Sequence, residues 1–178
     1  AIESLAVLPV VNSLVFIFRS LGLAFQETGI ALMGDRFEGY HRLRRFAIGL
    51  GSAVVGVLAL ISFTPASHFW YQTVSGLTTE LTAFALVPTQ ILAIIPGLTL
   101  LLTFQRSVLV TAKRTRPVTY ATSAEVITII VVLMLTTRFF DLTGVTGAAI
   151  AYVLGRLLAN ALLMRPYNQI IAAHKPEE

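Results

Sequence analysis

The stretch FALVPTQILAIIPGLTLLLTF, residues 84–104, contains no charged side chain. A helix of about 20 apolar residues crosses a hydrocarbon core roughly 30 Å thick, so this stretch is long enough to span a bilayer. Three more apolar runs lie at 47–63, 126–137 and 145–164. A soluble helical bundle needs polar helix faces, and these runs do not supply them. The pattern therefore predicts an integral membrane protein made of helices.

The composition agrees with a chain that lies largely in lipid. Of its 178 residues, 56% are hydrophobic and only 12% are charged, whereas soluble domains carry roughly 25% charged residues. We predict an all-α, polytopic transmembrane helical bundle that forms one domain over 1–178, with about five spans, at about 9–33, 46–63, 79–112, 117–137 and 144–164. Since the third span would be roughly 50 Å long as a straight helix, we expect kinks at Pro88 and at Pro96-Gly97.

The basic residues predict the orientation of the bundle. Of the thirteen Lys and Arg, nine lie in segments that share one side of the predicted membrane: Arg36, Arg42, Arg44, Arg45, Lys113, Arg114, Arg116, Arg165 and Lys175. Arg138 lies in a segment on the other side. Because cytoplasmic loops are enriched in Lys and Arg, we predict an outside N-terminus and a cytoplasmic C-terminus. This bias accounts for the basic pI, so no nucleic-acid partner is inferred. On the outer side, Phe69-Trp70-Tyr71 is predicted to lie in the interfacial aromatic belt.

Catalysis and cofactor binding find no support in the residues. The chain has no Cys, and its three His lie far apart in the sequence, so neither a thiolate nucleophile nor a clustered metal site is predicted. Ser and Thr lack a His or an acid at a spacing that suggests a triad, and no glycine-rich phosphate loop is present. We therefore predict a protein that is not an enzyme and has no cofactor.

Ionisable residues inside the spans are the candidate functional residues. A charge within the bilayer is costly, so it normally faces a partner or water. Counting helical rise from the cytoplasmic ends places Glu27, Arg106, Glu125 and Arg156 at about 10, 9, 12 and 14 Å, which is one common layer. Arg19 lies deeper, at about 22 Å, with Gln26 seven residues further along the same helix.

Two interpretations of this layer remain open. In the first, the residues line a charged cavity, in which arginines hold an anionic group and carboxylates couple protons or cations. In the second, Arg106–Glu125 and Glu27–Arg156 are internal ion pairs that fix the packing of helices. Arg19 has no acid at its depth, which favours a functional role for it.

Small residues mark a packing face on the last span. Gly147, Ala151, Gly155 and Ala159 recur at a spacing of four, which allows close approach of two helix backbones in lipid. We expect ordinary bundle packing rather than a sliding seam.

Two stretches carry a family resemblance. The first is FQRSVLV at 104–110, followed by the basic turn at 113–117 and a span that contains Glu125. The second is GVTGAAIA at 144–151. With the order of spans, they resemble the C-terminal lobe of the MATE-like multidrug/oligosaccharidyl-lipid/polysaccharide flippase superfamily, and in pattern most of all its progressive ankylosis branch.

The resemblance implies a secondary transporter of about twelve core helices in two lobes related by a pseudo-twofold axis. Five spans would match the last five of these helices, so the missing helices would have to come from elsewhere. Because the chain starts at Ala1, close to an apolar segment, we interpret it as part of a longer protein. The expected partners are membrane lipid and an N-terminal lobe or other membrane subunits, and the expected location is the bacterial inner membrane. The alternative function is a non-transporting subunit of a larger membrane complex.

Overall fold

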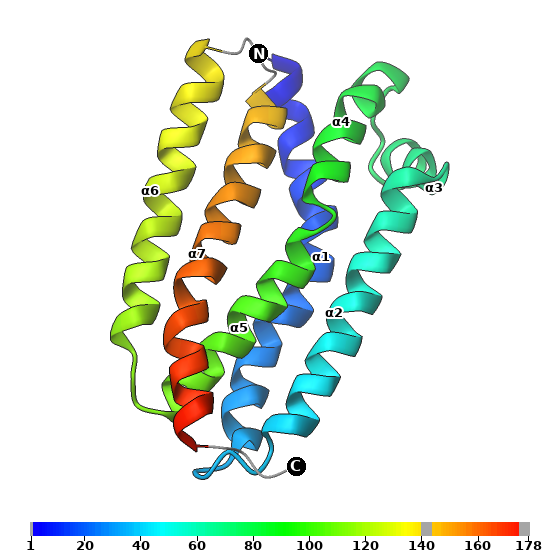
Figure 1. Ribbon diagram of the computed structural model, residues 1–178. Coiled ribbons are helices and arrows are strands. Elements are labelled where there is room, and N and C mark those ends of the chain that lie inside the picture. Colours follow the sequence, from blue (N-terminus) through cyan, green and yellow to red (C-terminus); the bar gives the residue numbers. More distant parts are fainter. Residues whose placement is uncertain (1, 140–143, 175–178) are drawn as a thin grey trace.

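The protein is a bundle of long helices, as a computed structural model that describes residues 2–139 and 144–174 shows (Figure 1). Within these ranges the elements are α1 (Ile2–Met33), α2 (Tyr40–Phe63), α3 (Ala66–His68), the π-helix η1 (Phe69–Val74), α4 (Thr79–Leu92), α5 (Ile95–Thr111), α6 (Arg116–Phe139) and α7 (Gly144–His174). Five spans, one of them formed by α4 and α5 together, are long and apolar enough to cross a membrane. The predicted all-α integral membrane protein is confirmed.

The third span breaks where α4 meets α5. Ala93 and Ile94 form a turn between the two helices, and Pro96 lies in the first turn of α5. A proline is tolerated there because the first backbone N–H groups of a helix have no partner within the helix. Pro88 instead lies inside α4 and does not end it. The break is therefore next to Pro96, which is one of the two predicted kink positions.

The last helix extends beyond its predicted bounds. The last span was predicted over about 144–164, whereas α7 continues through Arg165 and Pro166 to His174. Buried Ile170 and partly buried Tyr167 pack into the core and hold this extension in place.

Similarly, α2 begins at Tyr40, six residues before the predicted start of its span. Tyr40 and Leu43 are buried in the core, so the segment between the predicted first two spans is in part the first turns of a helix.

The aromatic group Phe69-Trp70-Tyr71, predicted for the interfacial belt, is divided between the surface and the interior of the bundle. Phe69 is exposed, whereas Tyr71 is fully buried and its hydroxyl is hydrogen-bonded to Thr89 Oγ1 on α4. The π-helix η1 folds back onto the bundle, so Tyr71 anchors it there instead of lying at the membrane surface.

The helices form a bundle in which α5 takes a central position (Figure 1). The closest helix pairs are α1 with α5 and α6 with α7, while α2 packs on α5 and α1. The α1–α2 and α5–α6 connections and the C-terminal part of α7 lie at the end of the bundle that is drawn lowest in Figure 1. We call it the basic end, because these segments and the first turns of α2 and α6 contain Arg36, Arg42, Arg44, Arg45, Lys113, Arg114, Arg116 and Arg165. Lys175, the loop at 140–143 and the tail at 175–178 lie outside the described residues.

Candidate functional site

An ion pair joins α6 to α7 inside the bundle. Arg156 Nη2 lies 3.2 Å from Glu125 Oε1, and the two side chains are 10% and 9% exposed. The expected pairs, Arg106 with Glu125 and Glu27 with Arg156, are therefore not the pair that forms. Glu27 is exposed on α1, and in the described part of the chain it has no ion-pair partner.

Close contact of the two helices explains this choice of partner. The four small residues of the predicted packing face are all buried on α7: Gly147, Ala151, Gly155 and Ala159. A Cβ added at Gly155 would lie 2.7 Å from Ile129 Cγ1 and 3.0 Å from the Glu125 carbonyl oxygen. A Cβ added at Gly147 would lie 2.8 Å from Thr136 Oγ1. These glycines let α6 approach α7 closely, which puts Glu125 within reach of Arg156.

Tyr152 connects this ion pair to Arg19. Arg19 Nη1 and Arg156 Nη2 both donate a hydrogen bond to the Tyr152 hydroxyl oxygen, the second at 3.1 Å. The two guanidinium carbons also lie 5.6 and 5.5 Å from the centroid of the Tyr152 ring, within the range of cation–π attraction. Tyr152 thus contacts the side chains of two arginines, which come from α1 and α7.

Arg106 belongs to the same charged group without forming an ion pair. Its Nη2 donates to Thr122 Oγ1 at 2.9 Å, and its Nε is buried with no hydrogen-bond partner in the described structure. The charges of Glu125 and Arg156 both act on it. The structure therefore brings together three of the four residues predicted to share a layer, while Glu27 faces away from them.

Gln26 lies beside this group, in the contact between α1 and α5. It is partly buried, and its main-chain carbonyl accepts a hydrogen bond from Ser107 Oγ at 3.1 Å. The structure therefore gives the Gln26 backbone a contact between α1 and α5.

The charged group carries an excess of positive charge. Arg19, Arg106 and Arg156 contribute three positive charges, and Glu125 contributes one negative charge. Among the described residues, no carboxylate other than Glu125 is ion-paired to an arginine of this group. Uncompensated charge is costly within a membrane, so the arrangement favours an additional anion.

A cavity of about 300 Å³ lies next to Arg19, between α1, α4 and α7. Its lining consists of Leu8, Asn12, Val15, Arg19, Leu92, Ala148, Ala149 and Tyr152. The Nε atom of Arg19 is buried and has no hydrogen-bond partner in the part of the chain that the structure describes. The cavity thus offers apolar walls with a guanidinium, a phenol and a carboxamide.

Sequence analysis missed the role of Tyr152 and of Asn160. Both lie four residues from Arg156, one before it and one after it, which places them on neighbouring turns of α7. Asn160 Nδ2 donates to the Leu98 carbonyl at 3.1 Å and to the Arg156 carbonyl at 2.9 Å. A search for polar residues at a spacing of four around each buried charge would have found both.

The chain has no match among protein-family models, curated proteins or solved structures. Arguments about its function therefore rest on the geometry of the site. Within the described residues, no group of His, Cys, Asp and Glu side chains has the arrangement of a metal site.

Proposed function

We propose that the chain is one lobe of a flippase-like secondary transporter, which moves an amphiphilic or anionic solute across the bacterial inner membrane by alternating access. The observation that carries this proposal is the position of Arg19, a partly buried cation that lines a cavity and has a phenol, not a carboxylate, as its hydrogen-bond partner. On this proposal the positive-inside rule places the basic end in the cytoplasm.

The surplus charge supports an anionic substrate group. A purely structural ion pair would neutralise itself, as Arg156 and Glu125 do. Arg19 instead shares the hydroxyl of Tyr152 with a second cation. Because a charge within the bilayer needs compensation, an anion entering the cavity would be attracted to Arg19. Release of that anion would follow when rocking of this lobe against the other lobe opens the cavity to the opposite side of the membrane.

The alternative, a non-transporting subunit of a larger membrane complex, would use the small-residue face of α7 as a contact for partner subunits. In this chain α6 already occupies that face at Gly147 and Gly155. A scaffold would therefore lack a free small-residue face on α7 for partner subunits, and we favour transport.

The proposal is tested with the intact gene product in proteoliposomes. The probes are labelled inorganic phosphate, a labelled dicarboxylate and a fluorescent short-chain phosphatidylglycerol. We expect transport of at least one probe and a loss of about tenfold in Arg19→Gln, since a lost charge interaction of about 1.4 kcal/mol corresponds to a factor of ten. Arg19→Lys should retain part of the rate, because it keeps the charge without the planar guanidinium.

Arg138→Gln serves as the matched control, since Arg138 is an exposed arginine in the last turn of α6. Its transport rate should equal that of the unchanged protein. Equal rates for Arg19→Gln and Arg138→Gln, at equal expression and thermal stability, would reject a role for Arg19 in transport.

A further inference from the structure

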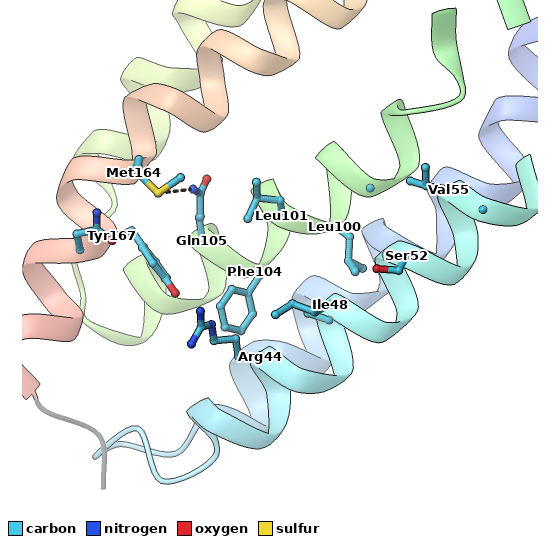
Figure 2. A pocket seen from close by; sticks show the side chains of 15 residues that line it. Arg44, Ile48, Ser52, Val55, Leu100, Leu101, Phe104, Gln105, Met164 and Tyr167 are labelled. Atoms are coloured by element: carbon cyan, nitrogen blue, oxygen red, sulfur yellow. Dashed lines mark hydrogen bonds between the residues drawn. The ribbon is translucent and has the colours of Figure 1, made fainter. Parts of the chain in front are cut away.

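A second, larger cavity lies on a different part of the bundle from Arg19. It measures about 710 Å³ and opens between α2, α5 and α7 (Figure 2). Both α2 and α7 pack against α5, so the cavity is a groove with α5 as its floor. Its walls are formed mainly by aliphatic and aromatic side chains, including Ile48, Leu100, Leu101 and Phe104.

Polar groups are concentrated toward the basic end of this groove. Arg44 projects from an early turn of α2 beside Phe104, with Tyr167 of α7 nearby (Figure 2). The charge of Arg44 acts on Tyr167, and the Tyr167 hydroxyl is hydrogen-bonded to Tyr40 at 2.6 Å. No carboxylate is present among the described residues that line the groove. The groove therefore has one cationic end and an otherwise apolar body.

A buried hydrogen-bond acceptor also lines the groove. Gln105 is 0% exposed, and its Oε1 has no donor in the described structure. Its Nε2 donates to the Asn160 carbonyl at 3.4 Å and contacts Met164 Sδ at 3.9 Å. Because Gln105 has no accessible surface, it forms part of the closed inner wall of the groove and is not itself available to a ligand.

We propose that the groove binds an anionic phospholipid of the leaflet at the basic end. The phosphate lies at Arg44, and one acyl chain follows the apolar walls past Leu101. Basic pockets between transmembrane helices bind anionic headgroups in this way. The inference does not depend on transport, since a resident lipid suits a transporter and a scaffold equally.

The size of the groove favours an acyl chain over a helix of another protein. A helix with its side chains is about 10–12 Å wide and rises 5.4 Å per turn, so each turn occupies roughly 400–600 Å³. The groove would contain fewer than about two turns of such a helix. An acyl chain is a single file of methylene groups and fits a narrow groove along its length.

Native mass spectrometry of the protein, purified in mild detergent and mixed with equal amounts of dioleoyl phosphatidylglycerol and dioleoyl phosphatidylcholine, tests the headgroup site. We expect phosphatidylglycerol to be retained about fivefold better, as one nearby basic residue predicts. Arg44→Gln should remove this preference. Arg45→Gln is the matched control, because Arg45 is exposed on the same turn and does not line the groove.

A second pair of variants tests whether the acyl chain lies in the groove. Gly56 lines the groove and Gly49 does not, and a Cβ added at either position meets nothing within 4 Å. Gly56→Phe should fill the groove and reduce retention of both lipids severalfold, whereas Gly49→Phe should leave retention unchanged.

The proposal is wrong if Arg44→Gln and Arg45→Gln reduce the preference equally, because the attraction would then come from the basic surface as a whole. It is also wrong if Gly56→Phe retains as much lipid as Gly49→Phe at equal thermal stability. Loss of a co-purifying membrane protein in Gly56→Phe alone would identify a helix as the occupant and would likewise overturn it.

Discussion

Arg156 and Glu125 form an ion pair across the contact between α6 and α7, with 3.2 Å between Nη2 and Oε1. Each side chain is about one-tenth exposed, so water contributes little to its solvation. The pair also fixes the position of Arg156 beneath Tyr152, whose hydroxyl accepts from Arg156 at 3.1 Å. The Arg156 guanidinium thus contacts both the Glu125 carboxylate, in the packing of α6 on α7, and the Tyr152 hydroxyl at the Arg19 cavity.

Removing one partner of this pair should destabilise the protein strongly. A buried charge without its partner costs about 3–5 kcal/mol, so Glu125→Ala and Arg156→Ala should each lower the thermal unfolding midpoint in detergent. The double variant Glu125→Leu with Arg156→Met should lower the midpoint by less than the sum of the two single decreases, because no charge remains unpaired. Arg138→Ala, at an exposed arginine of α6, should have no effect. Unchanged midpoints in both single variants would contradict a structural role for the pair.

Tyr152→Phe should weaken the Arg19 site while leaving the helix packing in place. The substitution removes the oxygen that accepts from both Arg19 and Arg156. Hydrogen bonds to charged groups contribute about 1.5–3 kcal/mol, so we expect a loss of roughly 2 kcal/mol in unfolding free energy, measured by denaturant titration in micelles. Tyr120→Phe, on exposed α6 surface, is the control. If the two variants unfold alike, the shared hydroxyl has no energetic importance.

Gly155→Ala and Gly56→Ala should change stability in opposite directions. At Gly155 the added Cβ would lie 3.0 Å from the Glu125 carbonyl oxygen, and overpacking of this kind costs about 1–3 kcal/mol. At Gly56 it meets nothing within 4 Å, so the higher helix propensity of alanine should stabilise α2 by up to about 1 kcal/mol. Comparing the two midpoints is the test, and a stabilised Gly155→Ala would show that α6 is not held against α7 as described.

Alkaline pH should release Tyr71 from the bundle. Burial raises the pKa of Tyr71 to about 12, with the hydrogen bond to Thr89 acting in the opposite direction. Because this pKa lies above the ordinary value of 10.0, the stability that Tyr71 contributes is complete below pH 10 and is lost as the pH rises toward 12.

The measurement for Tyr71 is a titration followed by the ultraviolet absorbance of tyrosinate. The difference between the unchanged protein and Tyr71→Phe should show a late transition near the raised pKa. A difference curve centred at the ordinary tyrosine value would mean that Tyr71 is accessible to water.

The depth of the charged residues could be predicted from the sequence, and their pairing could not. Helical rise placed Arg106, Glu125 and Arg156 at one level, and in the structure their charges do interact. The direction in which each side chain points depends on the rotation of each helix about its axis, which neighbouring helices determine. For this reason Glu27 was predicted to lie in the layer and is exposed instead.

The contacts of Tyr152 and Gln105 could not be predicted from the sequence either. Each lies in an apolar run, and the run alone does not indicate that this side chain makes a specific polar contact. Tyr152 gains its role only because α1 places Arg19 beside it, and Gln105 gains its contacts only because α7 packs on α5.

By itself, the sequence determined that the chain is a bundle of helices able to span a membrane, because hydrophobic length acts locally along the chain. It predicted kinks of the third span at two prolines, and the structure breaks beside Pro96 but not at Pro88. Only the tertiary structure decided that Glu125 pairs with Arg156, that Arg19 binds Tyr152 and that a groove opens next to Arg44. These contacts join residues far apart in the sequence, and they depend on which helices pack together and on how each is rotated.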